Sequence, residues 1–436
     1  MTAPGLIIAA PASGSGKTVM TLAVLRALKR RGLDVRSFKA GPDYIDPAFH
    51  TAATGRPAPN LDPWAMRDVT LQAEARRVSD DADIIVGEGV MGLFDGALDG
   101  TGSTADLAAR LAWPVVLVID VRGQATSAAA TLTGFVNFRS DVRIAGVIFN
   151  RVGGDSHAEL LRDAVADRVP VIGAVPRDQR LELPERHLGL VQAGEHGDLE
   201  RFLETAADII TEAVDLDALV DVAARPALET GAGDNTALPP LGQRIAVARD
   251  EAFAFAYPGV LEGWRRAGAD LTFFSPLADQ APDRSADAVY LPGGYPELHG
   301  ARLAANGVFM HGLREAGERQ AFVFGECGGF MVLGETLRDG DGRDHKMAGL
   351  LPVATSFAAP RLHLGYRRLS LLSACPLGAM GGGLRGHEFH YAAEIRRGGD
   401  PFFATKDARC IDRGEAGSRV GSVAGSFLHL IDRDSG

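Results

Sequence analysis

The stretch GLIIAAPASGSGKTVMTLAVL, residues 5–25, joins an apolar run to a glycine-rich loop and then to an Ala- and Leu-rich segment. This order predicts a buried strand, a phosphate-binding loop and a helix, and therefore an α/β fold. In such a loop, backbone N–H groups surround a phosphate and the helix N-terminus adds positive potential. We expect Gly14 and Gly16 to shape a nucleotide site, Lys17 to reach the terminal phosphates and Thr18 to ligate Mg²⁺.

The loop departs from the usual pattern at one position. Pro11 stands where the first glycine is normally found. A glycine-rich turn that binds nothing is therefore the alternative. The adjacent Lys17 and Thr18, followed at once by a convincing helix, favour the phosphate site.

Short apolar runs alternate with Ala- and Leu-rich segments through the first half of the chain. The runs are GLIIAA, DVRSFKA, DIIVGEG, VVLVID, IAGVIFN and VIGAVP. Runs this short and apolar are typical of strands buried on both faces, and the segments between them are long enough for crossover helices. We predict a doubly wound, mostly parallel sheet, closed by a helical region at about 198–224.

Four carboxylates occupy two loops that directly follow predicted strands. Asp43 and Asp46 lie in FKAGPDYIDP, and Glu88 and Asp95 lie in IIVGEGVMGLFDG. The carboxyl ends of parallel strands form the ligand-binding edge of such a sheet, so these groups are expected to face the phosphate loop. Mg²⁺ takes few protein ligands, and strand-end carboxylates are the candidates. A helix cap is the alternative for an aspartate that follows a strand.

Polar side chains also follow other strands. Asn150 ends the run IAGVIFN, where an amide suits the edge of a nucleotide base. Lys39, Arg122 and Arg151 are candidates for attracting anionic groups. Solvated loop positions are the alternative for each of them.

A stretch without periodicity separates two halves of the chain. RPALETGAGDNTALPP is rich in Gly, Ala and Pro, which predicts a linker. After it the α/β pattern restarts with RIAVARD, YPGVLEGWRRAG, DLTFFSP and AVYLPGG. We predict a first domain over residues 1–225, a linker over 226–242 and a second α/β domain over 243–436, since 436 residues exceed one ordinary core.

The stretch FVFGECGGFMVLG, residues 322–334, predicts a strand, a sharp turn and a helix with Cys327 at the turn. Gly325, Gly328 and Gly329 permit the turn and the close approach of a substrate. This is the arrangement of a nucleophile elbow. The helix N-terminus is expected to lower the pKa of the thiol. A cysteine buried in a core is the alternative.

A cysteine nucleophile needs a base. The candidates are His429 in GSFLHLID and His387 and His390 in GHEFHYA, and spacing alone does not choose among them. Upstream, AVYLPGG ends a strand at Gly293 and Gly294. Backbone N–H groups there would stabilise the oxyanion of an acyl-transfer intermediate.

Composition narrows the class of protein. A formal net charge of −11 disfavours nucleic acid as a partner. No run approaches the roughly 20 apolar residues that cross a bilayer, so no membrane partner is expected. The three cysteines are too few for a disulfide framework and fit a reducing cytoplasm. Cys375 and Cys410 lack the glycine-rich setting of Cys327 and are expected to be structural.

Together these motifs resemble a known family. The glycine pair, then GECGG, then a late histidine resembles the class I glutamine amidotransferase domain. The first half resembles the dethiobiotin synthetase-like branch of P-loop enzymes. Their fusion in this order, with GPDYIDP, EGVMGLFDG, LPGGYPE and GHEFHYA, resembles the cobyrinic or hydrogenobyrinic acid a,c-diamide synthases of vitamin B12 biosynthesis over essentially the whole chain.

The resemblance implies a carbon–nitrogen ligase. Cys327 would attack the side-chain amide of L-glutamine and release ammonia, with His429 as base and then acid. Gly294 and Gly328 would form the oxyanion hole. In the first domain, ATP with Mg²⁺ would phosphorylate a corrin acetate carboxylate, and ammonia would displace the phosphate. The a and c acetates would become acetamides.

The resemblance also implies which residues surround ATP, the metal ion and the corrin polyacid. The ATP positions are Gly14, Gly16, Lys17, Thr18 and Asn150; the Mg²⁺ positions are Thr18, Asp43 and Glu88; and those near the reacting carboxylate are Lys39, Asp46 and Asp95. A homodimer is expected.

One position departs from the amidotransferase pattern. The family domain usually carries Glu two residues after its histidine, whereas Ile431 stands there and Asp432 one residue further on. We therefore expect a Cys–His pair in which Asp432 is at best a slack third member. Such a glutaminase is expected to be slow until the other domain is loaded.

Three other functions stay open. Cobyric acid synthase amidates other side chains of the same ring, and Ni-sirohydrochlorin a,c-diamide synthase belongs to the same group. A ParA/MinD-type switch, in which ATP drives dimerisation, represents a different class. The cysteine turn and the second domain argue against the switch.

Overall fold

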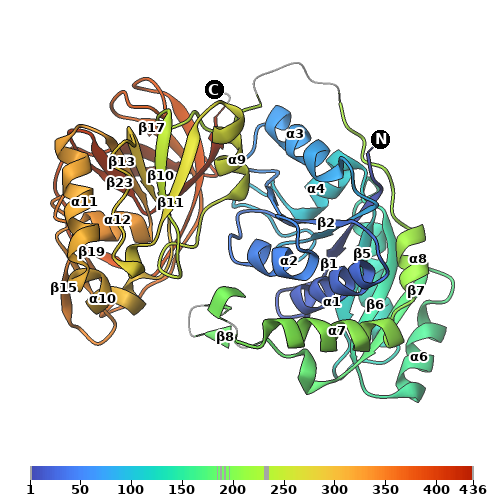
Figure 1. Cartoon of the computed structure of the whole chain (residues 1–436). Helices are drawn as coiled ribbons and strands as arrows, with labels where there is room; N and C mark the ends of the chain where they lie inside the picture. Colours follow the sequence, from blue (N-terminus) through green and yellow to red (C-terminus); the bar gives the residue numbers. More distant parts are fainter. Residues whose placement is uncertain are drawn as a thin grey trace. The chain divides into compact units, whose positions relative to one another are not determined.

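A computed structural model describes residues 2–183, 185–186, 189–190, 193–195, 197–229 and 235–434 (Figure 1). The chain divides into two compact units. The first comprises residues 1–64 and 71–233, and the second comprises residues 65–70 and 234–436. Part of the expected linker, residues 230–234, lies outside the described residues, so the domain boundaries stay a prediction.

The first unit is built on one parallel sheet. Its strands are β1 (Gly5–Ala9), β2 (Val35–Ala40), β3 (Asn60–Leu61), β4 (Ile84–Glu88), β5 (Val115–Asp120), β6 (Ile144–Val152) and β7 (Val171–Pro176). Their order is β3-β2-β4-β1-β5-β6-β7, and every neighbouring pair is parallel. This confirms the predicted parallel α/β fold. Only the two-residue edge strand β3 was not anticipated.

Helices connect the strands. They are α1 (Lys17–Arg30), α2 (Asp46–Thr54), α3 (Asp68–Ser79), α4 (Thr104–Leu111), α5 (Ser127–Phe138), α6 (Asp155–Val165), α7 (Leu199–Ala213) and α8 (Leu216–Asp221). The helices α1, α2 and α7 share one core with the sheet (Figure 1). Residues such as Leu6, Val86 and Val118 are fully buried there, and each such side chain contributes about 1.5–3 kcal/mol.

A second, smaller parallel sheet organises the other unit. Its strands are β10 (Arg244–Ala248), β11 (Asp270–Phe274), β12 (Ala288–Leu291), β13 (Phe322–Glu326), β22 (Ser418–Val420) and β23 (Val423–Ser426). The order is β11-β10-β12-β13-β23-β22, and only β22 runs antiparallel to its neighbour. The helices are α9 (Pro258–Arg266), α10 (Gly300–Ala305), α11 (Gly307–Glu318) and α12 (Gly328–Leu333).

Two further sheets complete this unit, one antiparallel and one mixed. One contains β17 (His363–Leu371), β18 (Gly383–His390), β20 (Phe403–Asp407), β21 (Asp412–Ala416) and β24 (Leu428–Arg433). The other contains β14 (Thr336–Arg338), β15 (Asp344–Lys346), β16 (Ala354–Ser356) and β19 (Ala393–Arg396), and in it β14 and β16 run parallel. The pairing of β18 with β24 brings the GHEFH motif beside the late histidine, with His387 directly opposite His429.

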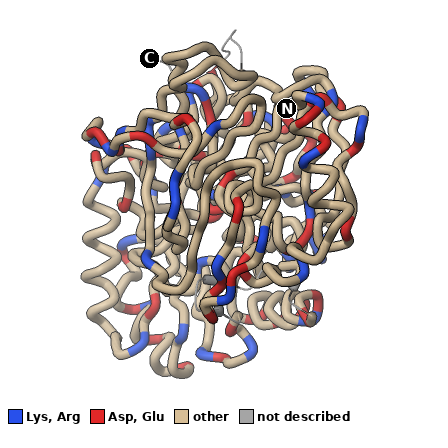
Figure 2. The backbone as a smooth tube through the Cα atoms, turned by 90° about the vertical axis from the view of Figure 1, so that its left-hand side faces the viewer, with Lys and Arg blue, Asp and Glu red and all other residues tan. Residues whose placement is uncertain are grey.

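Charges of both signs are interspersed along the backbone (Figure 2). This distribution suits a protein whose net charge is moderately negative. Among the described residues, no helix is both long and apolar enough to cross a membrane.

Candidate active sites

The glycine-rich loop joins β1 to α1 as the sequence predicts. The helix begins at Lys17, directly after Gly16, whose φ of 91° is left-handed. A side chain at Gly16 would place its Cβ 2.3 Å from Nδ2 of Asn150, so only glycine fits. Gly14 is also left-handed, with a φ of 79°. The loop therefore has the backbone that a phosphate cradle requires.

Glu88, at the end of β4, is the centre of a buried polar cluster. Its Oε1 accepts hydrogen bonds of 2.6 Å from Thr18 Oγ1 and 2.8 Å from Lys39 Nζ. Its Oε2 lies 2.7 Å from Nε2 of His50 on α2. Lys39 also contacts Asp46 Oδ2 at 2.5 Å. The structure thus brings four of the predicted residues into direct contact and adds His50, which the sequence analysis did not single out.

The charges in this cluster shift one another's pKa. Burial would lower the pKa of Lys39, but Asp46 and Glu88 outweigh it and raise the pKa, so the ammonium stays charged. Burial would raise the pKa of Glu88, yet the Lys39 ammonium holds it well below its usual range. Burial and the charge of Asp43 raise the pKa of Asp46. Burial and the nearby Lys39 lower the pKa of Lys17.

Two predicted carboxylates lie beside the cluster and serve backbone amides. Asp43 Oδ1 accepts from the N–H groups of Ile45 and Asp46 at 2.8 and 3.1 Å, at the start of α2. Asp95 Oδ2 accepts from the N–H of Gly92 at 2.9 Å. One oxygen of Asp43 therefore caps the start of α2, which was the alternative expected for an aspartate that follows a strand. The pKa of Lys17 is lowered overall, but the negative charge of Asp95 opposes part of this shift. Asp95 therefore lies close to the loop.

The donor set at the loop fits Mg²⁺. The ion prefers oxygen ligands in octahedral geometry, and cis ligands of bonds near 2.1 Å lie about 3 Å apart. Thr18 Oγ1 and Glu88 Oε1 are 2.6 Å apart, close to that spacing. Asp43 lies close enough to Lys39 and Asp46 to shift the pKa of both.

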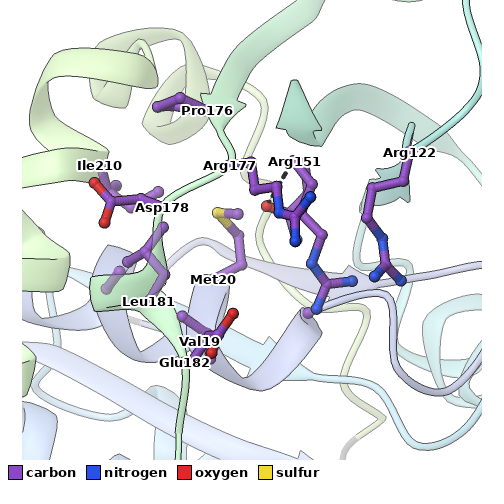
Figure 3. A pocket seen from close by; sticks show the side chains of 13 residues that line it. Val19, Met20, Arg122, Arg151, Pro176, Arg177, Asp178, Leu181, Glu182 and Ile210 are labelled. Carbon is purple, nitrogen blue, oxygen red and sulfur yellow. Dashed lines mark hydrogen bonds between the residues drawn. The ribbon is translucent and has the colours of Figure 1, made fainter. Parts of the chain in front are cut away.

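A pocket of about 100 Å³ opens beside the loop (Figure 3). Its lining includes Gly16, Asn150 and three arginines, Arg122, Arg151 and Arg177. Asn150 already uses its amide: Nδ2 donates to the carbonyl of Ser15 at 2.9 Å, and Oδ1 accepts from the N–H of Arg151 at 2.9 Å. In this structure Asn150 therefore holds the loop, and it lines the pocket at the same time.

Cys327 occupies the sharp turn that the sequence predicts. The strand β13 ends at Glu326 and α12 begins at Gly328, with Cys327 between them at φ 46° and ψ −104°. A left-handed non-glycine residue costs of order 1–3 kcal/mol, and such strain is found preferentially at functional sites. A Cβ on Gly325 would lie 2.7 Å from the backbone of Gly329, and a Cβ on Gly329 would lie 2.0 Å from the carbonyl oxygen of Leu291, so both positions need glycine.

The expected low thiol pKa is wrong. The Cys327 side chain is only 4% exposed and belongs to the hydrophobic core of its unit. Burial raises the pKa of the thiol, and the charge of Glu297 adds to this effect. A hydrogen bond from the N–H of Gly328 lowers the pKa of the thiol in part, but burial outweighs it. The cysteine is therefore a neutral thiol before any base acts on it.

His429 on β24 lies near Cys327. A Cβ on Gly293 would lie 3.1 Å from His429 Nε2 and 3.2 Å from Cys327 Cβ, so both side chains border the same small space. Burial lowers the pKa of His429 to about 3, so the ring is a neutral base. His390 instead stacks on Phe427, with ring centroids 3.9 Å apart.

The carboxyl group nearest to His429 is not the expected one. Glu326 Oε2 lies 3.9 Å from His429 Nδ1. Asp432 accepts from the backbone N–H and Nε of Arg67, at 2.8 and 3.0 Å. Asp432 is fully buried and is held by Arg67.

The two glycines assigned to the oxyanion hole lie together. A Cβ on Gly328 would be 3.0 Å from the nitrogen of Gly294. Among the hydrogen bonds between described residues, neither of these two amides donates to a backbone carbonyl. The nitrogen of Gly294 thus lies close to Gly328, the residue that follows Cys327, and the oxyanion hole stays a prediction.

Comparison with known proteins agrees with this pair of sites. Residues 6–191 match the CobQ/CobB/MinD/ParA nucleotide binding domain, and residues 244–435 match the CobB/CobQ-like glutamine amidotransferase domain. The chain is 57% identical over 431 residues to a hydrogenobyrinate a,c-diamide synthase of Brucella anthropi, covering 98% of each chain. It is 52% identical over 440 residues to the enzyme of that name from Mesorhizobium japonicum, covering 100% of each.

The chain belongs to the hydrogenobyrinate a,c-diamide synthase family. Membership confirms the family predicted from the motifs, the two-part α/β fold, and a carbon–nitrogen ligase with a glutamine amidotransferase domain. The roles of individual residues are not decided by membership alone.

Two residues of this family member were missed by sequence reasoning. They are His50 and Glu326. A signal was present for the last, because a carboxyl group at the end of the apolar run FVFG is unusual unless it is paired. No local pattern marked His50, since its partner Glu88 is 38 residues away.

Proposed function

We propose that this chain catalyses the ATP- and glutamine-dependent amidation of the a and c acetate carboxylates of hydrogenobyrinic or cobyrinic acid. The observation that carries the proposal is the presence of two built sites in one chain. One is a phosphate loop beside the buried Glu88 cluster, and the other is Cys327 near His429. Relatives named hydrogenobyrinate a,c-diamide synthase, matched over 98% of the chain or more, support the substrate.

The second unit would release ammonia from glutamine. The neutral His429 takes the proton of the Cys327 thiol, and the sulfur bonds to the side-chain carbonyl carbon. The N–H groups of Gly294 and Gly328 receive the developing oxyanion. The C–N bond then breaks, and ammonia leaves with the proton that His429 returns. Water hydrolyses the thioester to glutamate and regenerates the thiol.

Glu326 would hold His429 in place during these steps. Its carboxyl group faces Nδ1, so it favours the tautomer in which Nε2 is the base. On this proposal, the third member of the site would precede the cysteine rather than follow the histidine, and it would come from a different strand.

The first unit would activate the substrate. A corrin carboxylate oxygen bonds to the γ-phosphorus of ATP and ADP leaves; ammonia then attacks the acyl carbon and phosphate leaves. Lys17 would contact the terminal phosphates, and the charged Lys39 would attract the carboxylate. Mg²⁺, held by Thr18 and Glu88 with Asp43 nearby, would neutralise phosphate charge when bound. Asp46 and Asp95 would lie near the same reacting carboxylate.

Mass spectrometry of the products tests the proposal. The full chain is incubated with ATP, Mg²⁺ and glutamine, together with one of four substrates in separate reactions: hydrogenobyrinic acid, cobyrinic acid, cobyrinic acid a,c-diamide or Ni-sirohydrochlorin. Two successive acid-to-amide mass changes on a corrin acid are expected. Amidation only of a substrate that already carries the a and c amides would identify a cobyric acid synthase. ATP hydrolysis without any amide product would favour the switch.

Two finer statements accompany the proposal. We expect the reaction to take place in the cytoplasm, since the sparse cysteines fit a reducing compartment. We also expect a homodimer, which light scattering of the full chain tests.

A further inference from the structure

Two histidines and a glutamate form a cluster on β17 and β18, outside the Cys327–His429 pair. Ring nitrogens of His363 and His390 and a carboxylate oxygen of Glu388 all lie within 4.8 Å of one another. Antiparallel pairing sets His363 directly opposite His390. Imidazole nitrogen and carboxylate oxygen are the ligands that Zn²⁺ and similar divalent ions take in proteins.

The hydrogen bonds of His390 leave one atom facing the cluster. Nδ1 lies 2.9 Å from the carbonyl oxygen of Ala392, which can only accept, so Nδ1 carries the hydrogen. In a neutral ring Nε2 then presents a lone pair, and it points at Glu388 Oε1 from 3.1 Å. Two acceptors at that distance share either a hydrogen-bonding proton or a bound cation.

The other atoms of the cluster are already held by neighbours. Oε2 of Glu388 forms an ion pair of 2.5 Å with Arg367, which leaves Oε1 toward the histidines. The ring of His390 is stacked on Phe427, with the planes 12° apart. Metal-binding histidines and carboxylates are typically oriented in this way by outer partners. The site is thus arranged before any ion binds.

The position of His363 distinguishes a metal ion from a proton. A proton bridges two atoms, whereas a third nitrogen within 4.8 Å of both is the arrangement that a metal ion uses. The rings of His363 and His390 are stacked in parallel, with centroids 4.6 Å apart.

We propose that His363, Glu388 and His390 bind one divalent transition-metal ion of the Zn²⁺ class, with a further position left to water. Such an ion would link β17 to β18 next to Phe389, whose carbonyl oxygen lies 3.9 Å from Cys327 Sγ. The proposal concerns this chain's own side chains and holds whichever corrin acid the enzyme takes.

Zinc binding to the full chain tests the proposal. Protein stripped with a chelator is dialysed against Zn²⁺, passed through gel filtration and analysed for metal by mass spectrometry. One Zn²⁺ per chain is expected. Affinity should fall by at least about tenfold in both His363→Ala and His390→Ala, because each removes a direct ligand. His311→Ala, which alters an exposed His–Glu pair on α11, should bind as the parent does.

X-ray absorption at the zinc edge identifies the ligands without any variant. A shell of nitrogen and oxygen supports the site, whereas a sulfur neighbour means that a cysteine has captured the ion. Binding that is lost in Cys327→Ala but kept in His363→Ala overturns the proposal. So does a chain that retains no Zn²⁺, because a ring proton then explains the His390–Glu388 contact. Circular dichroism confirms that each variant is folded.

Discussion

Nδ1 of His429 lies 3.9 Å from Oε2 of Glu326, the residue that directly precedes Cys327. The same Oε2 accepts a hydrogen bond of 2.7 Å from the hydroxyl of Tyr290, and Oε1 accepts one of 3.1 Å from the N–H of Leu430. These bonds fix the carboxyl group beside the imidazole. The proposed nucleophile and the carboxyl group beside the proposed base are thus consecutive residues.

Glu326→Gln should change the pH profile of glutamine-dependent activity. Burial raises the pKa of Glu326 to about 8, so below that pH the group is a neutral acid and above it a carboxylate. The carboxylate stabilises the His429 imidazolium that forms during catalysis, so kcat of the parent should rise as pH passes through about 8. Glutamine cannot ionise, so the variant should lack this rise and be roughly tenfold or more slower at pH 9.

Activity with free ammonia provides the internal control for Glu326→Gln. It should be unchanged, because ammonia bypasses the cysteine. A variant that keeps the parent's pH profile would show that Glu326 does not act on His429.

Gly293→Ala should disrupt the nucleophile and base together. The new Cβ would lie 2.4 Å from Cε1 of His429, which has no room to retreat because it is fully buried. We expect glutamine-dependent kcat to fall by roughly 100-fold, the loss that follows displacement of a general base. Gly307→Ala is the matched control, since no atom lies within 4 Å of its new Cβ. Equal activity of the two variants would contradict the placement of His429.

Cys327→Ala should abolish the use of glutamine and keep amidation with free ammonia. In the proposed reaction the thiol releases ammonia from glutamine and does not contact the corrin carboxylate. The measurement is the rate of amide formation with each nitrogen source. Cys410→Ala is the matched control, because that cysteine is exposed. Loss of both activities in Cys327→Ala would mean that this cysteine is structural.

Lys39→Met should destabilise the first unit and stop ATP-dependent amidation. The change leaves two buried carboxylates, Asp46 and Glu88, without their shared ammonium. Breaking such a buried pair costs about 3–5 kcal/mol in the free energy of unfolding. Denaturant unfolding measures this, and glutaminase activity reports on the other unit.

The double variant Lys39→Met with Asp46→Asn separates stability from chemistry. Removing one of the stranded charges should restore part of the lost stability while amidation stays absent. Recovery of amidation along with stability would show that Lys39 has only a structural role.

Much of the fold could be predicted because its determinants are local. Six apolar runs became strands of the first sheet, and the glycine-rich loop lies where a strand meets a helix. The two-residue strand β3 escaped prediction because so short a segment has no periodicity. The segment Ala65–Thr70 also gave no indication that it packs with the second unit.

Prediction of the candidate sites was uneven for a related reason. Lys39, Asp46, Glu88 and Thr18 lie at strand ends or in the loop, and the parallel sheet brings strand ends to one edge. The same argument predicted that Asp43 and Asp95 lie near this cluster. One carboxylate oxygen of each accepts a hydrogen bond from a backbone N–H of a local turn. The spacing of residues in the sequence does not show whether a carboxylate bonds to a local turn or to a distant residue.

The sequence alone determined the two chemistries, since a phosphate loop and a cysteine between glycines depend on neighbouring residues and on φ values that only certain residues adopt. The tertiary structure decided which histidine lies near Cys327, which carboxyl group faces that histidine, and in which direction the thiol pKa shifts. These properties depend on strand pairing and on the exclusion of water. Strand pairing and the exclusion of water both depend on contacts between residues about 100 positions apart in the sequence. No local sequence pattern predicts such contacts.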